Sequence, residues 1–144
     1  MKKIMLIGRT GCGKTTLTQR LNGETVAYRK TQAVSYKSRI IDTPGEYVET
    51  KVFYRSLLVL SADAKYIVMI QAANDEDTIF PPKFSSMFPR KEIIGVVTKA
   101  DINSDTARSE RILLEAGASE VFKIGLEDEE GLKILKKRLG LDES

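Results

Sequence analysis

Apolar runs and amphipathic stretches alternate along this chain of 144 residues. Short runs that are apolar almost throughout predict buried strands, and stretches with apolar residues at helical spacing predict helices. The expected strands are residues 3–7, 33–37, 39–41, 66–72, 92–97 and 120–124. The expected helices include residues 13–21, 52–60, 105–116 and 129–139, and the pattern predicts about five helices in all.

Turn-forming and capping residues mark the ends of several of these elements. Asp105 is expected to cap the start of the helix at residues 105–116, and Gly117 is expected to end it. The strands at 33–37 and 39–41 are separated by a single residue, which predicts an antiparallel pair. The proline-rich residues 74–89 predict a loop with at most one helical turn, where a third helix would normally lie.

This order of elements predicts a three-layer α/β fold. Strands that are apolar throughout favour a mainly parallel sheet with helices on both faces. We expect about six strands, one of them antiparallel at an edge, in a single domain that covers residues 1–144. Ligands of such sheets bind at the carboxyl ends of the strands. The loops after residues 7, 41, 72 and 97 are therefore expected to form the site.

Composition excludes several classes of function. The chain has no histidine, so imidazole metal sites and histidine-based catalytic triads are excluded. Its single cysteine, Cys12, cannot form a disulfide within the chain, which fits a reducing cytoplasm. The net charge of +3 is too small to predict nucleic-acid binding. No apolar stretch approaches the length that spans a bilayer, so we expect no membrane segment.

The stretch GRTGCGKTT, residues 8–16, follows the first strand and opens the first helix. Gly8, Gly13, Lys14 and Thr15 fit the G-x-x-x-x-G-K-[ST] pattern of a phosphate-binding loop. Backbone N–H groups of such a loop point into one concavity at a helix N-terminus. We expect Lys14 to meet the β- and γ-phosphates and to act in catalysis, and the Thr15 hydroxyl to ligate Mg²⁺. The residues expected to contact a nucleotide here are Gly8, Arg9, Thr10, Gly11, Cys12, Gly13, Lys14, Thr15 and Thr16.

Two alternatives remain open for this loop. A glycine-rich turn between a strand and a helix can exist without any ligand. Cys12 lies beside Lys14 and a helix N-terminus, where its thiol pKa could be lowered, or it is simply a small side chain that the loop tolerates.

A second motif follows the strand at 39–41. In IIDTPGEY, Asp42 ends the strand and Gly45 comes three residues later. A carboxylate at this place can reach Mg²⁺, and the backbone N–H of Gly45 can donate to a γ-phosphate. Alone, this D-x-x-G spacing is mostly typical of a turn, but its position after the phosphate loop favours metal and phosphate contact.

A third motif, VVTKAD, follows the strand at 92–97 and holds Thr98, Lys99 and Asp101. The aliphatic stem of Lys99 can cover a purine ring. The Asp101 carboxylate can accept hydrogen bonds from guanine N1–H and the 2-amino group, whereas adenine would repel it. The alternative is an ordinary polar loop after a buried strand.

In this order, GRTGCGKT, DTPG and TKAD resemble the Ras-like family of P-loop GTPases. The pieces RKTQAV and IDTPGEY, in so short a chain, narrow the resemblance to the EutP/PduV family of ethanolamine- and propanediol-utilization proteins. The likeness covers residues 3 to about 139. It implies Mg²⁺ and GTP or GDP as cofactors, with ATP or ADP as alternatives, and Thr31 as a further Mg²⁺ ligand. It also implies a cytoplasmic protein whose partners include the shell or pathway proteins of a bacterial microcompartment.

The sequence departs from the Ras-like pattern at three places. Thr98 stands where GTPases usually carry asparagine, and Glu46 stands where a water-orienting glutamine is frequent. Gly125 and Leu126 replace the Ser-Ala pair of the loop that contacts the base. Guanine preference is therefore expected less firmly than phosphate binding.

Catalysis is predicted less clearly than binding. Glu46 could orient a water, although its charge would be repelled by phosphates, and Arg29 could add a cation over the γ-phosphate or remain a solvated surface charge. We expect slow intrinsic hydrolysis. Three functions stay open: a GTP-binding switch with slow GTPase activity, an ATP-dependent acetate kinase as described for members of the EutP/PduV family, and a non-enzymatic microcompartment protein.

Overall fold

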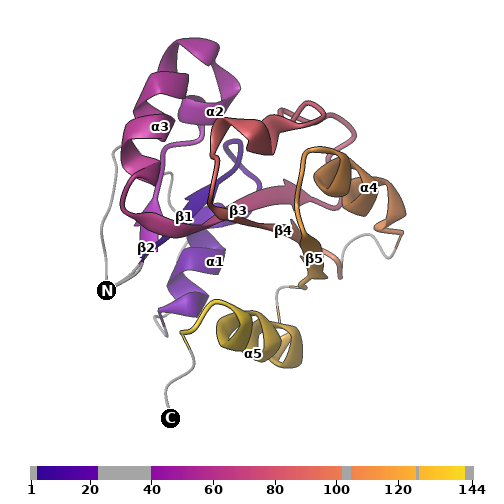
Figure 1. Cartoon of the computed structure of the whole chain (residues 1–144). Coiled ribbons are helices and arrows are strands. Elements are labelled where there is room, and N and C mark those ends of the chain that lie inside the picture. The colour runs from indigo at the N-terminus through magenta and orange to yellow at the C-terminus, as the bar shows by residue number, and fades with distance from the viewer. Residues whose placement is uncertain (1–2, 23–39, 102–104, 126, 142–144) are drawn as a thin grey trace.

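The computed structural model describes residues 3–22, 40–101, 105–125 and 127–141 (Figure 1). Its described strands form one sheet in the order β2-β1-β3-β4-β5, and every pair of neighbours is parallel. The strands are β1 (Lys3–Ile7), β2 (Ile40–Asp42), β3 (Ala64–Ala72), β4 (Glu92–Thr98) and β5 (Glu120–Lys123). The α-helices are α1 (Lys14–Leu21), α2 (Glu46–Glu49), α3 (Tyr54–Ser61), α4 (Ala107–Glu115) and α5 (Glu129–Arg138). Two short 3₁₀ helices are η1 (Lys51–Phe53) and η2 (Phe84–Met87).

The sheet divides the apolar core into two layers, because successive strand residues point to opposite faces. On β1, Met5 and Ile7 belong to the cluster that α3, η2 and α4 cover. Ile4 and Leu6 belong to the other cluster, which α1 and α5 cover. Figure 1 shows α1 and α5 on one side of the sheet and α2, α3 and α4 on the other. The expected three-layer α/β arrangement is therefore present.

The strand prediction needs correction. The structure describes five parallel strands, where we expected about six with one antiparallel at an edge. The expected strand at 33–37 lies outside the described residues. Its expected partner at 39–41 corresponds to β2, which pairs in parallel with β1 through Ile4 and Ile40, so β2 is a member of the parallel sheet.

The helix predicted at residues 52–60 is divided. The chain forms η1 and then α3 in its place, and the short helix α2 precedes them, which the sequence pattern did not predict. Val52 is 75% exposed, so its helical spacing with Leu57 does not reflect burial on a common face. Helix α4 begins at Ala107 with Thr106 in the N-cap position, where we expected Asp105. The Asp105 carboxylate instead accepts from the Ala107 N–H at 3.3 Å.

The end of α4 follows the prediction. Gly117 has φ +115°, a conformation that glycine adopts without strain. The N–H of Gly117 donates to the Leu114 carbonyl and that of Ala118 donates to the Leu113 carbonyl. These two bonds form the Schellman pattern, which ends a helix and satisfies its last carbonyls.

The proline-rich segment at residues 74–89 contains the single short helix η2, as predicted. An aromatic cluster replaces the missing α-helix on this face: Phe80, Phe84 and Phe88 are at most 5% exposed. The ring of Phe84 meets those of Phe80 and Phe88 edge to face, with centroids 5.3 and 5.9 Å apart. Within the described residues, no helix is long and apolar enough to cross a membrane.

Candidate functional site

The phosphate-loop motif forms the connection between β1 and α1. Gly13 lies at the N-cap of α1 with φ +92°, a conformation that a side chain would strain. The loop is a tight turn, in which the Cys12 N–H donates to the Arg9 carbonyl at 3.2 Å. Helix α1 then begins at Lys14, so the loop and the positive end of the helix dipole face the same space.

Lys14 and Asp42 form a buried ion pair at the centre of the site. Their Nζ and Oδ1 atoms are 2.8 Å apart, and each residue is 5% exposed. The pair joins the start of α1 to the end of β2, so the sheet brings together the two motifs that the sequence separates. The sequence prediction treated them as contacts of phosphate and metal, and it missed that they also contact each other.

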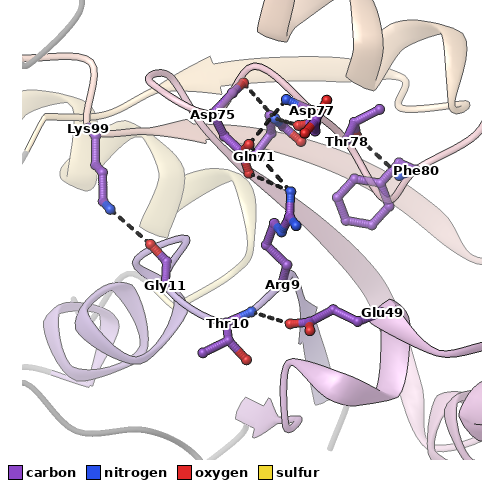
Figure 2. Close-up of polar contacts among 10 residues, drawn as sticks. All are labelled: Arg9, Thr10, Gly11, Glu49, Gln71, Asp75, Asp77, Thr78, Phe80 and Lys99. Atoms are coloured by element: carbon purple, nitrogen blue, oxygen red, sulfur yellow. Dashed lines mark hydrogen bonds and ion pairs between the residues drawn. The ribbon is translucent and has the colours of Figure 1, made fainter.

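The second motif packs directly on the phosphate loop. A Cβ added to Gly45 would lie 2.4 Å from both the amide nitrogen and the hydroxyl oxygen of Thr10, so only glycine fits. Figure 2 shows the Glu49 side chain reaching the same loop from α2. Its Oε2 accepts a hydrogen bond from the Thr10 N–H at 2.6 Å. This amide therefore already holds an anionic oxygen.

Glu49 was not predicted from the sequence. The signal that could have identified it is its position, about one helical turn after Gly45 and Glu46. Glu46 is the first residue of α2 and is partly buried. The predicted residues Arg29 and Thr31 lie outside the described residues.

The third motif contacts the phosphate loop from the end of β4. The Thr98 hydroxyl donates to the Cys12 carbonyl, so this threonine links the two loops at the place where asparagine is usual. The Lys99 ammonium donates to the Gly11 carbonyl at 2.8 Å, as Figure 2 shows.

A cavity of about 170 Å³ lies between α1, the end of β4 and the end of β5. Its largely apolar wall includes three ionisable residues: Arg20, Lys99 and Asp101. The complete lining is Gly13, Thr16, Leu17, Arg20, Thr98, Lys99, Asp101, Ile124 and Gly125. The structure thus brings the predicted base-contact residues Lys99 and Asp101 together beside Gly13 and Thr16 of the phosphate loop.

Arg20 is a residue of this cavity that the sequence analysis missed. It is 9% exposed, and its Nη1 donates to the Gly125 carbonyl at 2.9 Å. A signal existed, because Arg20 comes three residues after Leu17 and next to Leu21, on the apolar face of α1.

Two predicted loop residues have other surroundings than expected. Arg9 forms an ion pair with Asp75 at 3.1 Å, and the buried Gln71 amide donates to the backbone carbonyls of Asp75 and Asp77 (Figure 2). Arg9 therefore joins the phosphate loop to the segment after β3.

Burial raises the pKa of the Cys12 thiol from 9.0 to about 11, against the opposing charge of Lys14. The lowered pKa that the sequence allowed is wrong, and Cys12 is a buried small side chain.

Two of the three expected Mg²⁺ ligands, Thr15 and Asp42, belong to the described residues, and Thr31 lies outside them. Within the described ranges, no three acidic or cysteine side chains gather in a way that would hold a metal ion. Asp42 is the one predicted carboxylate ligand, and Lys14 contacts it. A metal here would need hydroxyl and phosphate oxygens as further ligands, which is how Mg²⁺ is usually held beside nucleotides.

A family model and the individual relatives both point to PduV and EutP proteins. Residues 1–141 match the model of the PduV-EutP family, described as ethanolamine utilisation and propanediol utilisation. The chain is 44% identical over 124 residues to the propanediol utilization protein PduV of Citrobacter freundii, covering 85% of this chain and 82% of that protein. It is 35% identical over 138 residues to the probable acetate kinase EutP of Salmonella typhimurium, covering 94% of this chain and 87% of that protein.

One solved structure has a similar fold. The GDP-bound RocCORdC structure of Methanosarcina barkeri Roco2 superposes with a TM-score of 0.64 at 16% identity. The match covers 96% of this chain and 47% of the Roco2 chain. The parallel five-stranded sheet and this likeness are consistent with a Ras-like P-loop fold.

Proposed function

This chain belongs to the PduV-EutP family of ethanolamine- and propanediol-utilisation proteins, and from that premise we propose that it binds a purine nucleotide with Mg²⁺. GTP and GDP are the favoured ligands, ATP and ADP the alternatives, and hydrolysis is slow. One observation carries the proposal: the Thr10 N–H in the loop before α1 and the ammonium of Lys14, the first residue of α1, both donate to carboxylate oxygens. Groups arranged for anionic oxygens at a helix N-terminus suit phosphates equally well.

Each predicted motif has a part in this proposal. Residues 8–16 hold the phosphates, with Lys14 meeting the β- and γ-phosphates. Thr15, Asp42 and Thr31 hold Mg²⁺, which neutralises phosphate charge when bound. Gly45 meets the γ-phosphate through its N–H. The base lies in the cavity beside Thr98, Lys99 and Asp101, and the similar fold of the GDP-bound Roco2 structure supports a guanine nucleotide as the ligand.

Two further residues have proposed roles in hydrolysis. Glu46 would orient the attacking water, and Arg29 would supply positive charge at the γ-phosphate. Among the described residues, Glu46 makes no contact that supports its role, and Arg29 lies outside them. We therefore expect turnover well below about 1 s⁻¹ without a partner, since faster rates usually need an arginine supplied to the phosphate.

The first experiment is a binding titration of the whole chain. GDP, GTP, ADP and ATP are titrated by calorimetry with and without Mg²⁺. We expect Mg²⁺-dependent binding with GDP and GTP ahead of ADP and ATP. Lys14→Gln and Thr15→Ala should weaken triphosphate binding at least about tenfold, whereas the exposed Lys133→Gln in α5 is a matched control and should not. No Mg²⁺-dependent association with any of the four nucleotides would refute the proposal.

A second candidate is acetate kinase activity, which the name of the Salmonella relative favours. The γ-phosphoryl group would pass from ATP to an acetate oxygen, leaving ADP and acetyl phosphate. Hydroxylamine converts acetyl phosphate to a coloured hydroxamate complex in the presence of iron. Hydroxamate that requires both ATP and acetate, and that Lys14→Gln abolishes, would establish this activity. A signal equal to the blank, with GTP bound more tightly than ATP, would exclude it.

Two broader parts of the proposal concern the whole protein. The chain acts as one nucleotide-binding domain, and its partners are shell or pathway proteins of a microcompartment. Co-sedimentation with purified microcompartments, in GDP and in a non-hydrolysable GTP analogue, tests the second part. Equal absence from the pellet in both states would contradict it.

A further inference from the structure

Arg20 is a buried charge that none of the three nucleotide motifs includes. It lies on α1, two turns after the phosphate loop, and is 9% exposed. Its carboxylate neighbour, Glu129 of α5, is 3.4 Å away but has an 84% exposed side chain. Such a hydrated partner offsets little of the cost of burying a guanidinium. The ion pair with Glu129 therefore does not explain why a guanidinium is buried at this position.

The closest contact of Arg20 leads to the base cavity. Its Nη1 donates to the Gly125 carbonyl at 2.9 Å. Gly125 packs against Asp101, since a Cβ added to it would lie 3.1 Å from the Asp101 Cβ and 3.3 Å from Oδ1. A backbone bond from Ile124 N–H to the Val97 carbonyl, at 2.9 Å, joins the same turn to β4. Arg20 thus acts on the wall behind Asp101, and it lines the cavity itself.

We propose that Arg20 is a positioning residue that sets the preference for guanine, through its hold on the Gly125 turn and its positive charge beside the cavity. This inference rests on the proposed nucleotide binding. The Asp101 carboxylate would accept from guanine N1–H and the 2-amino group. Guanine O6 is bonded to the carbon next to N1, and the inference takes it to lie on the Gly125 side of Asp101, which lines the same cavity. Adenine has an amino donor in place of O6, and positive charge there disfavours it.

Gly125 also stands at a departure of the sequence from the Ras-like pattern. Gly125 and Leu126 stand where the Ras-like family has the Ser-Ala pair of its base loop. A glycine turn has more freedom than the residues it replaces. Arg20 lies on a separate element, helix α1, and its hydrogen bond to the carbonyl of that glycine restricts part of this freedom.

The test compares nucleotides rather than activity. Binding of GDP, ADP and inorganic tripolyphosphate, each with Mg²⁺, is measured by calorimetry for the parent chain, Arg20→Met, Arg20→Lys and Glu129→Gln. We expect Arg20→Met to weaken GDP about tenfold and ADP by less than about twofold, with tripolyphosphate unchanged. Arg20→Lys keeps the charge and should recover part of the GDP affinity. Glu129→Gln removes only the exposed partner and should match the parent.

The outcomes separate this inference from the proposed function. If the parent chain binds no nucleotide, both are wrong. If the parent binds GDP but Arg20→Met weakens GDP and ADP by the same factor, Arg20 is only structural and this inference alone is overturned. Should Arg20→Met not fold, Arg20→Lys decides: an unchanged ratio of GDP to ADP affinity overturns the inference, and a ratio lowered at least about threefold supports it.

Discussion

The buried pair of Lys14 and Asp42 allows a quantitative prediction about stability. At 2.8 Å, two unit charges attract by about 6 kcal/mol if the effective dielectric constant is about 20. Burial of both ions costs several kcal/mol each, so the intact pair adds little net stability. Removal of one partner is different, because the other charge stays buried without its counter-ion. We therefore expect Lys14→Met to lower the free energy of unfolding by about 3–5 kcal/mol.

A double-mutant cycle isolates this interaction. Lys14→Met, Asp42→Asn and the double variant are unfolded in urea without nucleotide. Circular dichroism follows the transition, because the chain has no tryptophan. We expect the double variant to be more stable than the sum of the two losses predicts, with a coupling energy of at least about 2 kcal/mol. This magnitude follows from the burial of both side chains, which are 5% and 8% exposed.

The matched control is an exposed ion pair in the same chain. Lys65 and Glu92 are 3.5 Å apart, with side chains 37% and 43% exposed. Lys65→Met should change the free energy of unfolding by no more than about 1 kcal/mol. The reasoning is refuted if Lys14→Met costs as little as Lys65→Met, or if the losses at Lys14 and Asp42 are simply additive.

Three further predictions concern single residues. Glu49→Gln removes an anion from the Thr10 amide, so triphosphate affinity measured by calorimetry should rise about two- to fivefold; an unchanged or lower affinity would contradict this. Because its pKa is raised from 9.0 to about 11, the Cys12 thiol at pH 8 should hold about a hundredfold less thiolate than an ordinary cysteine. Its alkylation, followed by mass spectrometry, should be correspondingly slow and should accelerate with pH up to about 11; fast labelling of the folded chain at pH 8 would count against the assigned burial. Phe84→Ala opens the aromatic cluster and should cost about 3–5 kcal/mol in urea unfolding, whereas a loss below about 1 kcal/mol would mean that the cluster is not packed as described.

The turns and helix ends that the sequence predicted correctly are features that depend on local backbone geometry. The glycines of residues 8–16 predicted a turn from a strand into a helix, and the structure has this turn between β1 and α1. Gly117 identified the end of α4, since its positive φ is a property of that residue. The prolines of residues 74–89 correctly predicted that no full helix forms there.

The contacts that the sequence did not predict are those between distant segments. Arg20 of α1 meets Gly125, and Thr10 meets Glu49 of α2, because the parallel sheet brings these distant segments together. The apolar spacing of residues 52–60 predicted one continuous helix, but η1 and α3 divide this stretch and Val52 lies on the surface. Periodicity cannot tell an exposed apolar residue from a buried one without knowledge of the neighbouring element.

The aromatic segment between β3 and β4 has a consequence for the order of assembly. The N–H groups of Lys83 and Ser85 donate to the carbonyls of Glu115 and Ala116, at the end of α4. A helix in this place would satisfy its own backbone, but this segment depends on carbonyls that leave the ribosome later. These two hydrogen bonds therefore cannot form until residues 115 and 116 have been synthesised, although Phe84 already has Tyr54 of the earlier helix α3 as a neighbour.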